Sequence, residues 1–345
     1  MPTTTTATAP GRVHLSPLEV FGLRPLGPAL AQMRLAITGD GYLPPSRWGL
    51  SSTRQFKPRI SLPLWLGRRR RDRRVWIYNL PNHNLGPTYF VAGVDTRIRS
   101  CRDFRGKQLA YDSHVGTDFA TPIGTRVTAA APGLVRRVQN DMNRGGLKVV
   151  IDHGDGLFTS SNHLARALVV PGQRVARGEV VALSGMSSVD GVLFFPWLAP
   201  HVHFNVLADG GPDDPWSAQG EPSWWLDGND PGPWRGAAGP GTEQDAAKRG
   251  VIAASEDTAW APTRFDRDGV DRSIALCRDP RERARLAAVV DGDERGVELL
   301  VSRVYKTALF EGFPPIVVDP AARGPRLSLP FHRDDYDGVA FADEA

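Results

Sequence analysis

The chain has 345 residues, enough for two or three compact units with a sizeable core. Its 42 lysine and arginine residues slightly outnumber its 38 aspartate and glutamate residues, and 29 prolines and 36 glycines favour turns and loops. No apolar run reaches the length of a membrane span, and no nucleic-acid-binding motif is visible. These features exclude a membrane-spanning protein and argue against a nucleic-acid partner, and they leave the oligomeric state open. Cys101 and Cys277 lack a paired metal-binding spacing and are expected to be free thiols, with one long-range disulfide as the alternative.

Residues 1–74 are expected to form an N-terminal extension without a catalytic constellation. Residues 1–10 predict a disordered lead and lack the basic and apolar regions of a secretory signal peptide. Ser16 and Pro17 are residue types that favour an N-cap and a first helical position, so a helix broken by later prolines should begin here. The extension ends in an arginine-rich run at residues 68–74, which predicts a solvated loop or strand edge; an anchor for an anionic polymer is the alternative.

Residues 75–216 have the pattern of a β-rich domain with its core at 108–216. Alternating apolar and polar residues over 75–90 predict one or two lead-in strands, and residues 108–207 predict short strands separated by glycine, proline and Asp-Gly turns. Three asparagines and a histidine near the first predicted turn are interpreted as turn residues, with a plug of a metal site in a latent form as the alternative. They are Asn79, Asn82, His83 and Asn84.

Five of the eight histidines lie in the middle of the chain, in a pattern that favours a metal site. His201 and His203 occupy alternate positions of an apolar, partly β-branched run, so both imidazoles should face one cleft in a strand. Gly116 allows the backbone to bend tightly between His114 and Asp118. A carboxylate beside two imidazoles is a donor set that suits zinc.

A hydrolytic zinc site keeps three protein ligands and leaves one position for water. The candidate ligands are His114, Asp118 and His203. His163 and His201 would then stay uncoordinated and close enough to act on the water. The fifth histidine, His153, lies in an Asp-His-Gly-Asp-Gly turn between predicted strands and is expected to be structural.

The order of these motifs resembles the lysostaphin/LytM-type zinc endopeptidases, which cut peptidoglycan cross-links. The resemblance covers roughly residues 108–216, under a third of the chain. The family carries H-x-G-x-D, then H-L, then H-x-H-F, together with a ladder of glycines and valines between them. The three histidine motifs are matched at 114–118, 163–164 and 201–204, and the ladder at 124–135, 149–156 and 169–185.

The resemblance implies a mainly β, antiparallel catalytic domain that binds one zinc ion per chain. It implies His114, Asp118 and His203 as the ligands, and His163 and His201 as catalytic residues that act on zinc-activated water. The expected reaction is hydrolysis of an amide bond in a peptidoglycan stem peptide or cross-bridge. A location in the cell envelope would follow, although no signal peptide is visible.

Two departures from the family pattern concern substrate fit. Ser161 stands where the family often has an aromatic residue, two positions before the histidine of H-L. Residues 186–200 replace a short Gly/Thr/Ser link with a longer apolar insertion that carries Phe194, Phe195 and Trp197. We interpret this insertion as a wall or lid of the substrate groove, with packing against the tryptophans of the following segment as the alternative.

The last third of the chain changes from β to helical patterns. Residues 217–245, rich in glycine, proline and tryptophan, predict a linker or wrapping segment, and residues 246–345 predict a helical region with an exposed acidic tail. Asp279 is an expected N-cap, followed by proline at the first helical position. Apolar residues near period 3.6 predict a second helix over 293–310.

Two alternative functions remain open from the sequence. Some relatives with this fold have lost their ligands, so a non-catalytic cell-wall-binding or amidase-activating LytM-like module is one alternative. A zinc hydrolase that acts on non-wall peptides is the other. Zinc content and turnover on cell-wall sacculi would separate these alternatives from a peptidoglycan endopeptidase.

Overall fold

A computed structural model of the chain describes residues 14–39, 42, 50–82, 100–111, 114–143, 145–218, 220–236 and 260–344. The predicted disordered lead, His83, Asn84 and much of the predicted linker lie outside the described residues. Among the described residues, no helix is long and apolar enough to cross a membrane.

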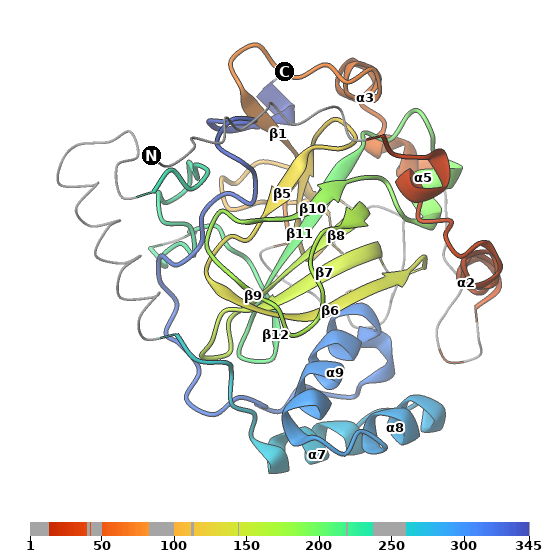
Figure 1. Cartoon of the computed structure of the whole chain (residues 1–345), viewed down its shortest axis with the longest axis vertical. Helices are drawn as coiled ribbons and strands as arrows, with labels where there is room; N and C mark the ends of the chain where they lie inside the picture. The colour runs from red at the N-terminus through yellow and green to blue at the C-terminus, as the bar shows by residue number, and fades with distance from the viewer. Residues whose placement is uncertain are drawn as a thin grey trace, which may run out of the picture.

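An eleven-stranded, mainly antiparallel sheet lies at the centre of the molecule (Figure 1). Its strands follow the order β13-β1-β4-β11-β8-β7-β6-β9, with β10 beside β5 and β8, and β12 beside β11. β13 and β1 run parallel, and β2 (Ser100–Cys101) and β3 (Ala110–Tyr111) form a separate small sheet. The strands of the large sheet are β1 (Arg74–Asn79), β4 (Thr117–Ala120), β5 (Arg126–Thr128), β6 (Gly133–Asp141), β7 (Gly146–Asp152), β8 (Phe158–Ala167), β9 (Arg174–Val175), β10 (Val180–Ser184), β11 (His201–Ala208), β12 (Gly211–Asp213) and β13 (Gly338–Phe341).

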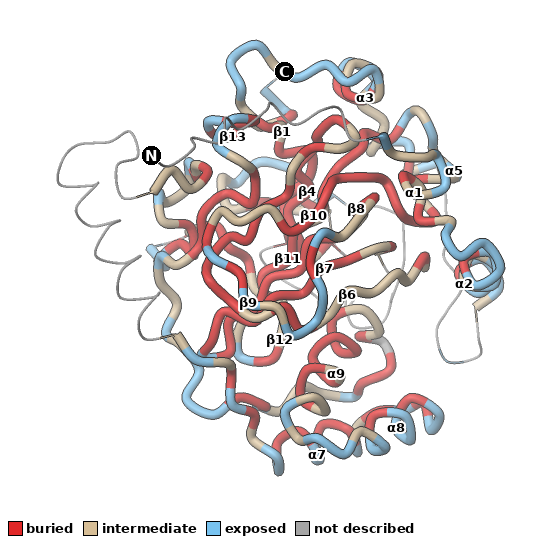
Figure 2. The backbone as a smooth tube through the Cα atoms, viewed as in Figure 1, coloured by how far each residue is buried: buried red, intermediate tan, exposed pale blue. Residues whose placement is uncertain are grey.

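The central strands are apolar on both faces, because each face packs against a different core. Successive side chains of a strand point to opposite faces, so Val149 and Ile151 of β7 join the main core while Val150 between them joins a second one. The second core also contains Phe158 of β8 and Leu207 of β11. Figure 2 accordingly shows the strands as mostly buried. This arrangement confirms the predicted mainly β, antiparallel catalytic fold.

The second core is closed by helices from the C-terminal region, which lie together in the lower part of Figure 1. Asp279 caps the second of these helices with Pro280 at its first position, as predicted. The predicted helix over 293–310 is present but ends at Tyr305, and the sequence did not indicate the first helix. The helices are α7 (Arg267–Ala275), α8 (Pro280–Ala287) and α9 (Gly292–Tyr305), with the short turns η2 (Thr307–Leu309) and η3 (Ala342–Glu344) after them.

Short helices of the N-terminal extension lie on the right and at the top of Figure 1, next to the insertion at residues 186–200. Ser16 forms a capping box with Glu19, and Pro17 starts the first helix, as predicted. The sequence did not indicate the helix α3 (Pro58–Trp65). The helices are α1 (Pro17–Val20), α2 (Leu26–Thr38), η1 (Leu50–Gln55), α3 (Pro58–Trp65) and α5 (Val189–Leu193), the last within the insertion.

The prediction of an exposed acidic tail holds for four acidic residues, Asp334, Asp337, Asp343 and Glu344, but not for the rest of the segment. Asp335 and Tyr336 are buried, and β13 adds a parallel strand to the edge of the sheet beside β1. The carboxylate of Asp335 accepts hydrogen bonds from Arg69 and Arg126. β13 itself, Gly338–Phe341, contains no acidic residue and buries Val339, so this short apolar run places part of the tail in the sheet.

The described part of the predicted linker wraps around the main core. Trp224 and Trp225 are buried there, next to Trp216. The arginine-rich run is largely neutralised within the chain, because Arg69, Arg70, Arg73 and Arg74 form ion pairs with Asp335, Asp72, Asp337 and Asp230. Cys101 and Cys277 are not joined in a disulfide bond, as expected.

Candidate metal centre

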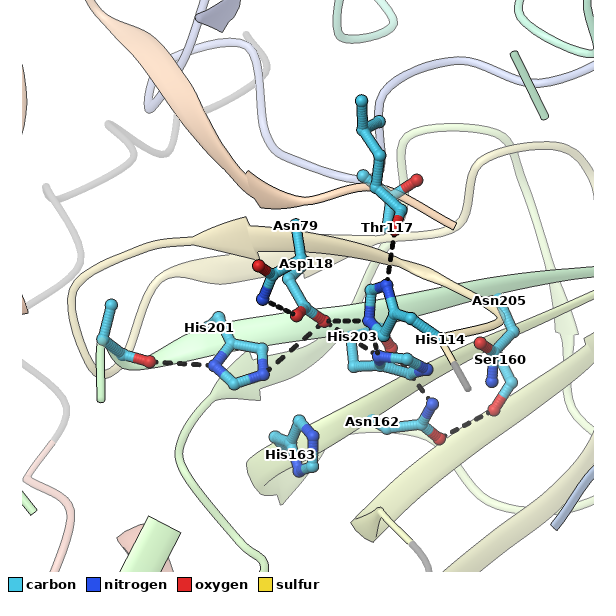
Figure 3. A network of polar contacts seen from close by, with 12 residues as sticks. Asn79, His114, Thr117, Asp118, Ser160, Asn162, His163, His201, His203 and Asn205 are labelled. Atoms are coloured by element: carbon cyan, nitrogen blue, oxygen red, sulfur yellow. Dashed lines mark hydrogen bonds and ion pairs between the residues drawn. The ribbon is translucent and has the colours of Figure 1, made fainter. Parts of the chain in front are cut away.

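Three neighbouring strands and one preceding loop bring the predicted residues together (Figure 3). Asp118 lies on β4, and His203 of β11 is directly opposite it in the antiparallel ladder. His201 precedes on β11, and His163 lies on β8, the other neighbour of β11. His114 comes from the loop before β4. The register of β11 between β4 and β8 therefore positions the cluster.

One oxygen of Asp118 is the centre of this cluster. Asp118 Oδ1 lies 2.8 Å from His203 Nδ1, 3.1 Å from His114 Nε2 and 3.6 Å from His201 Nε2. His114 Nε2 and His203 Nδ1 are 3.2 Å apart. His114 and Asp118 are buried, and one ligand atom from each of the three residues falls within 4.8 Å of the others. Among the described residues, these three form the only group with such spacing.

The donor set fits a single zinc ion. Two imidazoles and a carboxylate are ligands that zinc prefers in hydrolytic sites. His114 Nδ1 donates to the carbonyl of Leu80 at 2.7 Å, which turns Nε2 toward the other ligand atoms as the nitrogen available to a metal. Asp118 keeps Oδ1 toward the cluster because Oδ2 accepts a hydrogen bond from Asn79 Nδ2 at 2.8 Å. The supporting contacts thus orient two of the three ligands.

Gly116 is required by space as well as by the bend between the ligands. A Cβ at this position would lie 2.7 Å from His203 Nε2 and 2.4 Å from Asn205 Oδ1. Both distances are shorter than any real Cβ contact, so a side chain would displace His203. Gly116, in the first motif, therefore leaves open the space that His203, the ligand in the last motif, occupies.

His163 and His201 lie beside the candidate ligands and are oriented by the insertion. The carbonyl of Ser187, near its start, accepts from His163 Nδ1 at 3.1 Å. The carbonyl of Ala199, near its end, accepts from His201 Nδ1 at 2.8 Å. The two rings are 4.8 Å apart, and each presents Nε2 as its remaining nitrogen. Both are thereby in the tautomer that can accept a proton at Nε2.

The backbone of His163 is in the left-handed region, with φ of 60°. A histidine there carries a conformational cost of about 1–3 kcal/mol, which the surroundings must offset. Its N–H donates to Gly145 and its carbonyl accepts from Gly185, so the strained residue is held on both sides. No pattern in the sequence indicated this backbone conformation.

The charges of the cluster suit a metal ligand set. Burial alone would raise the pKa of Asp118, but the imidazoles of His114 and His201, and the hydrogen bonds from His114 and His203, hold it well below its usual value. Loss of hydration lowers the pKa of His163, and His201 and His203 lower it further. Burial also lowers the pKa of His203. The carboxylate is therefore ionised, and these two imidazoles are neutral near pH 7.

Two predictions about other polar residues near the site have clear outcomes. His153 is structural as expected, because its two nitrogens contact the carbonyl of Pro132 and the hydroxyl of Thr159, each at 2.8 Å. Asn79 is not a turn residue but part of β1, opposite Asp118. Its hydrogen bond to Asp118 orients this candidate ligand. In the sequence, only the alternation of apolar and polar residues over 75–90 indicated that Asn79 lies in a strand.

The insertion packs against the N-terminal extension. Phe195 contacts Phe21 and Trp65, with ring centroids 5.8 Å and 4.8 Å away, and Phe194 contacts Phe56 at 5.5 Å. Trp65 Nε1 also donates to the carbonyl of Leu198 at 3.0 Å. Phe194 and Phe195 thus pack on the N-terminal extension, whereas the predicted alternative was packing on the tryptophans of the following segment.

A largely buried His-Asp-His set beside two further imidazoles is the arrangement of a metallopeptidase centre. Residues 112–215 match the profile of Peptidase family M23, and with this site they form a peptidase M23 domain of the LytM/lysostaphin type. All five site residues that the sequence predicted lie within the matched segment.

Relatives of this domain include named cell-wall enzymes. The peptidoglycan DD-endopeptidase ShyA of Vibrio cholerae is 40% identical over 125 residues, which cover 34% of this chain and 27% of the relative. ShyB of the same organism is 40% identical over 101 residues, or 29% and 22% of the two chains. The catalytic domain of lysostaphin from Staphylococcus simulans is 27% identical, with 30% of this chain and 75% of that chain covered and a TM-score of 0.26. The match thus spans about a quarter of the curated relatives.

Proposed function

We propose that this chain is a zinc-dependent endopeptidase that hydrolyses an amide bond in peptidoglycan stem peptides or cross-bridges. The observation that carries the proposal is the convergence of three ligand atoms, from His114, Asp118 and His203, within 4.8 Å, next to two imidazoles that are held by backbone carbonyls at Nδ1. The relatives named as DD-endopeptidases favour a DD bond of a cross-link among the candidate bonds.

When bound, zinc would lower the pKa of a coordinated water toward about 7 and polarise the scissile carbonyl. The side chains of His163 and His201 supply the proton transfers. Each is held by a backbone carbonyl at Nδ1, so its Nε2 accepts a proton from the attacking water or donates one to the leaving amine. In the protonated state either ring also stabilises the developing oxyanion. Two histidines therefore do the work that one glutamate does in H-E-x-x-H peptidases.

The test is mass analysis of muropeptides released from purified sacculi by the zinc-loaded full chain, with and without a chelator. We expect cross-linked muropeptides to be converted to shorter products, and chelation to stop the conversion. His201→Ala, which keeps all three ligands, is the matched control for contaminating hydrolases.

Two results would contradict the proposal. Zinc-loaded protein that binds sacculi without releasing products would indicate a non-catalytic cell-wall module. Cleavage of a peptide library without cleavage of sacculi would indicate a hydrolase of non-wall peptides.

A further inference from the structure

A tyrosine from the C-terminal helices reaches the strands that carry the site. Tyr305, the last residue of α9, donates from its hydroxyl to Asn162 Oδ1 at 2.7 Å. The same hydroxyl lies 2.7 Å from Ser160 Oγ and accepts from Asn205 Nδ2 at 3.3 Å. Ser160, Asn162 and Asn205 are fully buried on β8 and β11. Tyr305 lies outside the segment that matches the peptidase family.

Asn162 connects this polar cluster to the candidate metal centre, as Figure 3 shows. Its Nδ2 donates to the backbone carbonyl of His203 at 3.1 Å, and the two residues are paired across the β8–β11 ladder. It also directly precedes His163, the residue with the strained backbone. With Oδ1 bound to Tyr305 and Nδ2 bound to His203, the amide of Asn162 has one satisfied orientation.

The chemistry of Tyr305 suits a fixed donor. Burial raises its pKa to about 12, so the hydroxyl stays protonated at any pH at which the protein would work. The ammonium of Lys148, itself fully buried, lies 3.8 Å from the centre of the tyrosine ring and holds the ring in place. The ring is thus fixed independently of its hydroxyl.

This cluster is more polar than packing alone requires. The surrounding core is made of valine, leucine and phenylalanine, and apolar side chains of similar size could fill the same space. Burial of hydroxyl and amide groups costs free energy unless every partner is satisfied, so the cluster depends on mutual hydrogen bonds. These polar groups are explained if they hold β8 and β11 together next to the ligand His203.

We propose that Tyr305 is a positioning residue of the metal centre, which acts through Asn162 on His203 and His163. The importance of Tyr305 for catalysis rests on the proposed function. Its contacts bear on zinc binding alone, which can be measured without a substrate. It makes the C-terminal helices part of the peptidase, because α9 supplies a support that the matched segment lacks.

The test is the zinc affinity of Tyr305→Phe, measured by competition with a chelator on the folded full chain. The substitution removes the hydroxyl and keeps the ring over Lys148. We expect zinc affinity to fall several-fold, which is less than the roughly 10- to 100-fold cost of losing a partner bound directly to a metal ligand, because Tyr305 acts through Asn162. Tyr336→Phe is the matched control, because Tyr336 is also buried but packs against Phe331 and Arg69. It should retain the zinc affinity of the original chain.

A double-mutant cycle with Asn162→Ala separates positioning from a general loss of stability. If Tyr305 acts through Asn162, the double variant should bind zinc about as weakly as Asn162→Ala alone. Zinc affinity of Tyr305→Phe within twofold of the original chain, or full additivity of the two losses, would overturn the proposal. Loss of zinc affinity in a chain that does not cleave sacculi would support the positioning role and reject the peptidoglycan function.

Discussion

The two oxygens of Asp118 have different partners. The distances of His203 and His201 from one of them distinguish a metal ligand from a catalytic residue. Oδ1 faces the imidazoles and Oδ2 is held by Asn79. His203 is bound to Oδ1 at 2.8 Å, whereas His201 Nε2 is 3.6 Å away, although both belong to one strand. Neighbours on one face of β11 should therefore respond differently to substitution.

We expect His203→Ala to lose stoichiometric zinc, and His201→Ala and His163→Ala to retain it. The last two variants keep all three ligands but lose groups that transfer the proton or stabilise the oxyanion, so turnover should fall roughly 10²- to 10⁴-fold in each. Combining these two substitutions should cost less than the product of the single losses, because both groups serve one step. Zinc content measured beside turnover checks this. An empty site in His201→Ala with zinc retained in His203→Ala would reverse the assignment.

Gly116 offers a test of the site that leaves every ligand in place. A Cβ at this position meets His203 Nε2 at 2.7 Å, so Gly116→Ala should displace the ligand and weaken zinc binding. Gly27→Ala is the matched control, because no heavy atom lies within 4 Å of its Cβ and the residue is in α2. The measurement is zinc affinity by chelator competition. Equal affinity of both variants would show that His203 does not need this space.

Local spacing in the sequence places His201 on the same face as His203 and His114 near Asp118, whereas the role of His163 beside them was implied by the resemblance to the LytM-type family. Residues i and i+2 of a strand share a face, and a glycine permits the bend between His114 and Asp118. The contacts of Asn79 and Tyr305 with the site could not be predicted from local spacing. Each acts across a pairing between distant parts of the chain, β1 with β4 and α9 with β8, which no local pattern specifies.

At the scale of elements, the insertion at residues 186–200 has two roles that the sequence could not separate. Its ends hold the two catalytic candidates through the carbonyls of Ser187 and Ala199. Its middle exposes about half of Phe195 and Trp197, which are 51% and 50% exposed. The ends are thus tied to the chemistry, whereas the exposed aromatic residues are available to a substrate.

Replacing Phe195 and Trp197 together by serine should change substrate preference and leave zinc bound. The reason is that neither side chain touches a ligand, while the carbonyls at the ends of the insertion remain. The measurement is KM and kcat on sacculi and on soluble muropeptides, beside zinc content. Val290→Ser, an exposed apolar residue between α8 and α9, is the control. Unchanged kinetics on every substrate would remove the insertion from the substrate groove.

At the scale of the whole molecule, the last strand and the end of the N-terminal extension meet at one edge of the sheet. β13 pairs with β1, the strand that carries Asn79, and Asp335 joins Arg69 of the N-terminal extension to Arg126 of β5. The β core could be predicted from its turns and alternation, since these are local. The closure of the edge by the last strand could not, because it depends on a pairing over more than 260 positions.

The buried carboxylate at this closure should make stability depend on pH. Burial alone would raise the pKa of Asp335, but hydrogen bonds from Arg126 and the charge of Arg69 outweigh it and hold the pKa below its usual value. A lowered pKa contributes stability above the unfolded value, near 3.9, which is lost as pH falls through the folded value. Asp335→Asn should therefore lower the free energy of unfolding at pH 7 by about 1–3 kcal/mol. The difference from the original chain should shrink as the pH falls below about 4.

Asp334→Asn is the matched control for this prediction, because Asp334 is 65% exposed and only 3.8 Å from the same Arg126. An exposed pair of this kind contributes little, so the free energy of unfolding should change by less than about 0.5 kcal/mol. Urea unfolding of the three chains between pH 3 and pH 7 gives the comparison. A deficit in Asp335→Asn that stays constant across this range would mean that the stabilisation comes from shape and packing. An equal deficit in both variants would mean that burial of Asp335 does not distinguish the two carboxylates. The expected result, a deficit confined to Asp335→Asn and to pH values above about 4, would show that an ionised carboxylate holds the end of the chain on the sheet edge next to the site.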